Sequence, residues 1–151
     1  MKETDTAIYF WGGIFSNFYP LAGGSVTSEK FFMMSKAILF NDEPSLKKIA
    51  MSASPMAAKR LGRKVKNFNP EVWDKMKEPA MMSALMHKFA ISPDFQVSLK
   101  ESGNKLLVEA SPDDSIWGIG FSEHDAEGNE ANWGQNLLGK CLMELRDGML
   151  G

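Results

Sequence analysis

The segment from Ser28 to Phe40 constrains the fold more than any other part of the sequence, because it is too long and too apolar to be a loop. Thr27 or Ser28 can cap a helix there, and Glu29 lies in the first turn, where negative charge is favourable. Apolar side chains cover nearly every side of this helix, so we expect most of its circumference to be buried. The sequence therefore predicts a largely buried helix at the centre of the fold.

Two charged residues, Glu29 and Lys36, interrupt this apolar surface. Their spacing is almost two helical turns, so both side chains leave the same stripe, about 10 Å apart along the axis. Burying either charge is costly unless the group is paired or used. Both groups could lie at the rim of the helix and reach water, which is the commoner position for Glu and Lys. Alternatively, the stripe is a pocket wall that carries two reactive groups, and this segment alone leaves both interpretations open.

Length and composition limit the class of protein. A chain of 151 residues can form one domain with a proper core. The net charge of -2 argues against general affinity for nucleic-acid backbones or anionic membranes. Cys141 is the single cysteine, so no internal disulfide can form and a reducing compartment is expected. Because the apolar run within residues 1–10 is too short for a signal or membrane segment, we predict a soluble cytoplasmic protein.

Further helices are predicted where a capping residue precedes a proline at the first helical position. This combination occurs at Ser54-Pro55, Asn69-Pro70 and Ser92-Pro93. A shorter helix is expected over residues 44–51, and Gly62 is a typical C-terminal signal for the helix that begins at Pro55. Pro79 is expected to divide the helix that begins at Pro70 from a second helical segment over residues 81–89.

The remaining elements are fewer and shorter. Strands are predicted at residues 7–11 and 105–110, and a turn is predicted at Gly23-Gly24. Residues 121–132 are expected to be irregular, and a last helix is expected over about 135–147. The fold class is therefore α+β, a mostly helical single domain over residues 1–151 with a few short strands.

A loop with ligand-binding character follows the second strand. Asp114 and its neighbour Asp113 precede Trp117 and Gly118, so carboxylates, an indole and a close backbone approach occur together. The carboxylates could instead cap a turn, and Trp117 could fill the core. The glycines here do not form a dinucleotide fingerprint, because no third glycine follows at the required spacing.

Positive charge gathers around the turn at Gly62. The cluster consists of Lys59, Arg60, Arg63, Lys64 and Lys66. Such a run is usually a solvated face, but guanidinium groups also suit phosphate. Asn17, in an aromatic loop over residues 15–19, suits a planar ligand, although such a loop is at least as often an anchor to the core. His87 and His124 lack partners at metal-ligand spacing, so neither a metal nor a cofactor is expected.

Taken together, these motifs resemble the NADAR (YbiA-like) family along essentially the whole chain, in unbroken order. The matching pieces are Phe15-Ser16-Asn17-Phe18, Ser28-Glu29, Lys36-Ala37, Ser54-Pro55, Leu61-Gly62-Arg63, Trp73, Met81, Lys88-Phe89, Leu107-Val108-Glu109, Asp114, Trp117-Gly118, Gly120, Asn136-Leu137-Leu138-Gly139 and Leu142-Met143-Glu144-Leu145-Arg146. One departure is Lys30, because many members carry a histidine directly after the glutamate.

The resemblance implies N-glycosidase chemistry on a small phosphorylated nucleoside-like substrate. Known members hydrolyse aminouracil phosphoribosides of the riboflavin pathway, and others remove ADP-ribose from guanine. The resemblance carries active-site roles to Glu29, Trp73, Asp114 and Trp117, and the role of a catalytic lysine in the ADP-ribose branch to Lys36.

These roles agree with the chemistry of the residues. A carboxylate stabilises the positive charge that builds on the sugar as the glycosidic bond breaks. A lysine in an apolar wall favours its amine form and can attack the sugar. Arg60 and Arg63 would hold phosphate, and the indoles of Trp73 and Trp117 would stack on the base. The alternative function is a module that binds NAD-like or ADP-ribose ligands without turnover, although the presence of both Glu29 and Lys36 favours the enzyme.

Overall fold

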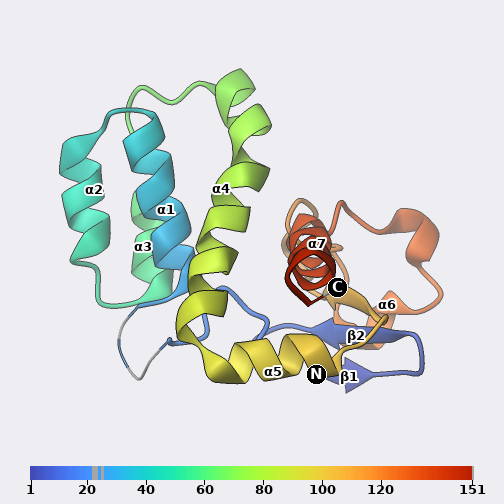
Figure 1. Cartoon of the computed structure of the whole chain (residues 1–151). Coiled ribbons are helices and arrows are strands. Elements are labelled where there is room, and N and C mark those ends of the chain that lie inside the picture. The colour runs from blue at the N-terminus through green and yellow to red at the C-terminus, as the bar shows by residue number, and fades with distance from the viewer. Residues whose placement is uncertain (22–23, 25, 151) are drawn as a thin grey trace. The chain divides into compact units, whose positions relative to one another are not determined.

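The computed structural model describes residues 1–21, 24 and 26–150, and these residues form two compact units (Figure 1). The helical unit comprises residues 17–92, and the sheet unit comprises residues 1–16 together with residues from 93 onward. The helical unit is thus an insertion within the sheet unit along the chain. The predicted turn at Gly23-Gly24 includes Gly23, which lies outside the described residues.

The helical unit is built from four helices connected by short loops. These are α1 (Ser28–Leu39), α2 (Glu43–Ala50), α3 (Pro55–Gly62) and α4 (Pro70–Ile91). Each begins at a residue whose side chain accepts a hydrogen bond from a backbone N–H of the first turn, as expected for N-caps. The capping residues are Thr27, Asp42, Ser54 and Asn69. The predicted starts of the helices at Pro55 and Pro70 are therefore confirmed, together with the caps that precede them.

The first helix, α1, packs against each of the other three helices, as Figure 1 shows. Its one exposed residue is Ile38, so the prediction of a largely buried helix is confirmed. The approach of α3 is close because Gly62 faces Met33, and a Cβ atom at Gly62 would lie 2.0 Å from the Met33 sulfur. A glycine therefore ends α3 and also lets it approach α1.

The predicted interruption at Pro79 is wrong, because α4 runs without a break from Pro70 to Ile91. Pro79 is exposed, so the carbonyl that loses its helical partner there can be solvated by water. The buried residues that follow are Met81, Ala84, Leu85 and Lys88. Their spacing keeps one face of α4 in the core, and this packing outweighs the cost of the internal proline.

The sheet unit contains a small mixed sheet in the order β1-β2-β3. The short strand β1 (Lys2–Glu3) is antiparallel to β2 (Ala7–Phe10), and β2 is parallel to β3 (Leu106–Glu109). The helices of this unit are α5 (Pro93–Glu101), α6 (Glu123–Ala126) and α7 (Leu137–Leu150). Helices with a small sheet confirm the predicted α+β class.

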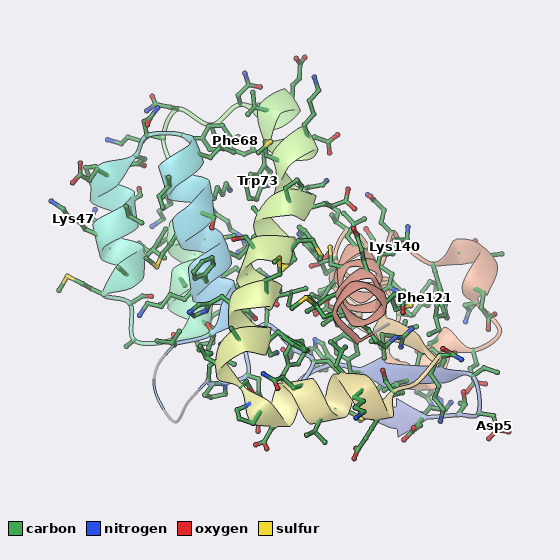
Figure 2. The ribbon with its side chains drawn as sticks, in the orientation of Figure 1. Asp5, Lys47, Phe68, Trp73, Phe121 and Lys140 are labelled. Atoms are coloured by element: carbon green, nitrogen blue, oxygen red, sulfur yellow. The ribbon has the colours of Figure 1, made fainter. Side chains whose placement is uncertain are left out.

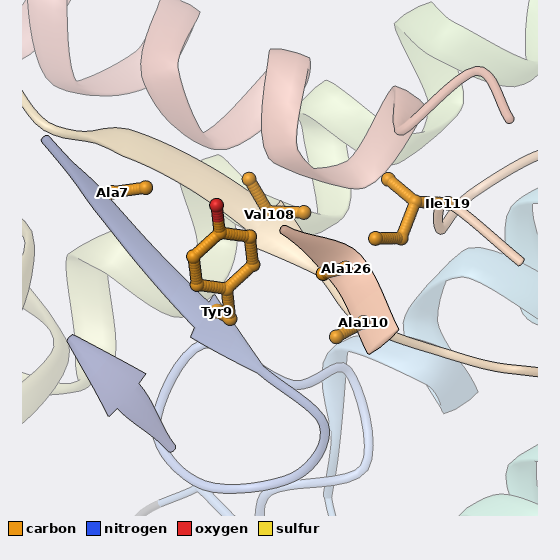
Figure 3. Close-up of a cluster of buried hydrophobic side chains, with 6 residues drawn as sticks. All are labelled: Ala7, Tyr9, Val108, Ala110, Ile119 and Ala126. Carbon is orange, nitrogen blue, oxygen red and sulfur yellow. The ribbon is translucent and has the colours of Figure 1, made fainter. Parts of the chain in front are cut away.

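Residues of β2, of β3 and of the segments that follow β3 form one buried cluster (Figure 3). Its members are Ala7, Tyr9, Val108, Ala110, Ile119 and Ala126. Trp133 packs edge-on against Tyr9, and its indole N–H donates to the carbonyl of Ala126 at 2.9 Å.

The expectation of an irregular segment over 121–132 is wrong in part, because α6 and a 3₁₀ turn (Glu130–Asn132) lie within it. Among the described residues, no helix is long and apolar enough to cross a membrane.

Candidate functional site

The candidate site is centred on Lys36, whose ammonium group lies against two aromatic rings. Its Nζ atom is 4.7 Å from the centre of the Phe68 ring and 5.4 Å from the centre of the Trp73 ring. Both distances are within the range of a cation–π interaction. The structure thus brings together Lys36 and Trp73, two of the predicted site residues, and adds Phe68. Figure 2 shows Phe68 and Trp73 near the end of α1 and the start of α4.

These rings belong to a larger aromatic cluster that fixes their positions. Phe40, at the end of α1, packs against Phe68 at 5.3 Å and against Trp73 at 6.4 Å between ring centroids. Phe32, two turns earlier on α1, packs against Trp73 at 5.3 Å. Trp73 is half-buried because Phe32 and Phe40, two turns apart, both pack against it, and its indole is held beside Lys36 rather than free in solvent.

The protonation of Lys36 is set by two opposing influences. Its half-buried position disfavours the charged form and lowers the pKa of the amine below the usual lysine range. The carboxylate of Glu29 opposes this effect and raises the pKa, but burial is the larger influence. Glu29 itself is buried. Two charged groups on one largely buried helix therefore influence each other, and neither Glu29 nor Lys36 is fully exposed.

Asn17 positions the start of α1. Its amide oxygen accepts from the Ser28 hydroxyl at 2.9 Å, its amide nitrogen donates to the Met81 sulfur at 3.4 Å, and its carbonyl accepts from the Glu29 N–H at 3.0 Å. Asn17 therefore connects the first turn of α1 with α4. Lys30 is buried and donates from Nζ to the carbonyl of Ser52 at 3.0 Å.

The two arginines of the basic turn are exposed. Arg60 lies in the last turn of α3, and Arg63 is the residue that ends this helix. The segment after them is held by Asp42, whose carboxylate accepts from the Lys66 N–H at 2.8 Å and from Ser45. These hydrogen bonds hold the pKa of Asp42 below its usual range.

The sheet unit contains the other predicted site residues, Asp114, Trp117 and Gly118. The Oδ1 atom of Asp114 accepts from the N–H groups of Ile116 and Trp117, both at 2.9 Å, so this carboxylate caps the turn. Gly118 is buried, and a Cβ atom there would lie 2.8 Å from the carbonyl oxygen of Glu109. The turn-capping alternative for Asp114 is thus observed, whereas its predicted catalytic role remains a prediction.

A downstream residue, Asn136, holds this loop against β3. Its amide donates to the Leu107 carbonyl at 3.0 Å and accepts from the Glu109 N–H at 3.0 Å, and its own N–H donates to the Gly118 carbonyl at 3.0 Å. Its φ of 51° lies in the left-handed region, which asparagine tolerates better than most residues. The loop of the sheet unit is therefore built jointly by β3 and the start of α7.

Two further residues of the helical unit were missed by the sequence analysis. Phe68 contacts Lys36, and its only signal was an aromatic side chain directly after the basic turn. Lys88 is fully buried on α4, and burial lowers the pKa of its amine to about 7. The sequence could have indicated the burial of Lys88, because it lies three residues after Leu85 and four after Ala84, on the apolar face of the helix. Within the described part of the chain, no cluster of metal-ligating side chains occurs.

Comparison with known proteins places these features in a family context. The NADAR domain model matches residues 9–150. N-glycosidase R617 of Acanthamoeba polyphaga mimivirus is 41% identical, over 96% of this chain and 97% of its own length. N-glycosidase YbiA of Escherichia coli K12 is 35% identical, over 95% of this chain and 88% of its own. The NMR structure of E. coli YbiA superposes with a TM-score of 0.76 at 33% identity, covering 99% of this chain and 88% of that one.

Proposed function

The chain belongs to the NADAR domain family, and on that premise we propose that it is an N-glycosidase acting on a phosphorylated riboside or an ADP-ribosyl adduct. In general terms it is a hydrolase of N-glycosyl bonds, the activity for which its curated relatives are named. The finer proposal covers two substrate classes, the aminouracil phosphoribosides and ADP-ribose on guanine. We further propose that both units act as one domain, because the family match spans residues of each.

The observation that carries this proposal is the environment of Lys36. A half-buried amine with a lowered pKa loses its proton more readily than an ordinary lysine, which makes it the better candidate for a nucleophile. In the proposed step, the Lys36 nitrogen forms a bond to C1′ of the sugar while the bond from C1′ to the base nitrogen breaks. The electron pair of the broken bond leaves with the base. One proton of the attacking amine is transferred to the departed base, and the other is transferred to the ring oxygen as the bond from C1′ to that oxygen breaks and the C1′–N double bond forms. The resulting imine is hydrolysed by water, which releases the sugar and regenerates Lys36.

Glu29 and the other predicted residues have supporting roles in this proposal. The Glu29 carboxylate stabilises the positive charge that develops on the sugar, and Trp73 offers a face for stacking. Arg60 and Arg63 are exposed guanidinium groups that suit phosphate or pyrophosphate. We assign Asn17 to substrate binding on the motif match, with its observed hydrogen bonds placing it at the start of α1.

Asp114, Trp117 and Gly118 complete the proposed set of residues. Their assignment to the substrate rests on the motif match alone, with Asp114 as a catalytic carboxylate and Trp117 as a stacking surface. The capped turn gives that loop a defined conformation.

Product analysis tests the function directly. The purified protein is incubated separately with ADP-ribosylated guanine and with aminouracil phosphoribosides, and release of the free base is measured by chromatography and mass spectrometry. We expect release from at least one of them. Tight binding of ADP-ribose without any base release from either substrate would instead support the alternative, a non-catalytic binding module.

Borohydride trapping tests the role of Lys36. Added during turnover, borohydride should reduce the imine to a stable secondary amine on the peptide that contains Lys36. Lys36→Arg should abolish both adduct and activity, because a guanidinium stays protonated. Lys59→Arg is a matched control, since Lys59 also lies over an aromatic ring, that of Phe18 at 5.9 Å. Turnover without an adduct, with activity retained in Lys36→Arg, would assign the attack to water.

A further inference from the structure

The ring of Phe68 is the nearer of the two aromatic surfaces that contact the Lys36 ammonium, and neither the motif match nor the proposed reaction uses it. Phe68 is 43% exposed, so a role as a core residue explains it poorly. Its ring lies 4.7 Å from Lys36 Nζ, compared with 5.4 Å for the ring of Trp73. An exposed aromatic ring held against a candidate nucleophile needs an explanation beyond packing.

Two hydrogen bonds fix the segment that leads into Phe68. The preceding residue, Asn67, adopts a left-handed φ of 61° and donates from its side chain to the Phe40 carbonyl at 3.3 Å. One residue earlier, the Lys66 N–H donates to the Asp42 carboxylate at 2.8 Å. The Phe40 ring then packs against the Phe68 ring at 5.3 Å, with 61° between the ring planes. Phe68 therefore projects from an anchored segment rather than from a free loop.

We propose that Phe68 is a positioning residue for Lys36: its ring holds Nζ by a cation–π contact while the group is protonated and by an N–H···π contact once it is the amine, so that the amine is aimed consistently at the sugar. The lysine side chain has four rotatable bonds, so an unrestrained Nζ would sample many positions. Contact with two ring faces restricts that freedom before substrate binds, which is the preorganisation that a nucleophile needs. This inference rests on the proposed function for its catalytic consequence, but the contact itself can be tested without substrate.

The contact also has an electrostatic consequence of known sign. Ring faces attract the ammonium form, so Phe68 and Trp73 favour protonation and act in the same direction as Glu29. Burial acts in the opposite direction. Within the described chain, Glu29 is the charged group that acts on Lys36, while the groups that face it from α4 and from the segment before α4 are uncharged rings. Removing one ring while keeping an apolar side chain should therefore lower the pKa of Lys36.

The test is competitive labelling of Lys36 with acetic anhydride as a function of pH, quantified by mass spectrometry of the Lys36 peptide. Phe68→Leu keeps an apolar side chain against Phe40, and we expect the labelling midpoint to fall by about 0.5 pH unit. Phe68→Tyr retains a ring and should restore the wild-type midpoint. Phe18→Leu, which removes the ring beneath Lys59, is the matched control and should leave the Lys36 midpoint unchanged.

Turnover supplies the second measurement. In Phe68→Leu, kcat at pH values where Lys36 is fully deprotonated should fall at least about fivefold, with a smaller change in KM. Phe68→Tyr should recover most of the loss. An unchanged or raised midpoint in Phe68→Leu, or a kcat within twofold of wild type, would overturn the proposal. If the wild type releases no base at all, the proposed function fails, and the labelling midpoint alone then decides whether Phe68 holds Lys36.

Discussion

Replacing Lys88 by methionine should remove a pH dependence of stability that this buried lysine gives the protein. Lys88 is fully buried on α4, and burial lowers the pKa of its amine to about 7 from 10.5. Methionine is unbranched and of similar length, so it can occupy the same space without a charge to desolvate. Removing the amine therefore removes an electrostatic cost that the folded state pays at neutral pH.

The size and the pH dependence of the effect follow from proton linkage. Between about pH 7 and pH 10.5 the unfolded chain binds a proton at Lys88 that the folded protein does not. The free energy of unfolding therefore rises with pH across this window. The part of it that depends on the protonation of Lys88 is fully present above pH 10.5 and is lost as the pH falls to about 7. At 1.36 kcal/mol per pH unit, the whole window corresponds to on the order of 5 kcal/mol.

The assay is urea unfolding followed by circular dichroism, for wild type and Lys88→Met, at intervals across that pH window. The stability of the wild type should rise relative to that of Lys88→Met as the pH goes from about 7 to 10.5. Subtracting the two curves isolates Lys88, because every other lysine titrates in both proteins. A difference in stability that stays constant with pH would refute the reasoning, since Lys88 would then have the same pKa in the folded and unfolded states.

Three further predictions concern single hydrogen-bonding residues. Asp42→Asn should make stability fall less steeply as the solution is acidified. The pKa of Asp42 is lowered in the folded protein, so its carboxylate stabilises the fold above the unfolded pKa, and this stability is lost as the pH falls through the folded pKa. Identical acid-unfolding curves for the variant and the wild type would contradict this. Asp114→Asn should keep the fold, because an amide oxygen can still accept from the N–H groups of Ile116 and Trp117. The variant should lose most of its turnover. Near-normal rates would mean that Asp114 only caps the turn. Asn136→Ala should lower the free energy of unfolding by about 1–3 kcal/mol in urea titrations, because two hydrogen bonds to β3 are lost; an unchanged midpoint would mean the loop does not depend on it.

Helix positions could be predicted from the sequence where the signals are local. The caps at Ser54 and Asn69 lie next to prolines that fit the first turn, so the helices begin where the sequence indicated. The break at Pro79 was wrong for a non-local reason. The residues after the proline bury a continuous face of α4, and the cost of the missing hydrogen bond is smaller than the gain from that burial.

The candidate site was predictable only in part. The spacing of Glu29 and Lys36 was enough to place them on one stripe of a helix, and the carboxylate of Glu29 raises the pKa of Lys36 against the larger effect of burial. The contact of Lys36 with Phe68 depends on how the segment before α4 turns back over the end of α1. That turn requires the left-handed backbone of Asn67 and its bond to Phe40, which no periodic pattern reveals.

The parallel pairing of β2 with β3 also sets an order of events during synthesis. Strand β2 ends at Phe10 and its partner begins at Leu106, so β2 leaves the ribosome long before β3 is made. The whole helical unit, residues 17–92, is translated in between. Its contacts are local and form quickly, whereas strand pairing over so long a separation is slow. The helical unit that carries Lys36 can therefore fold first, and the loop that carries Asp114 can form only after β3 and the start of α7 have been translated.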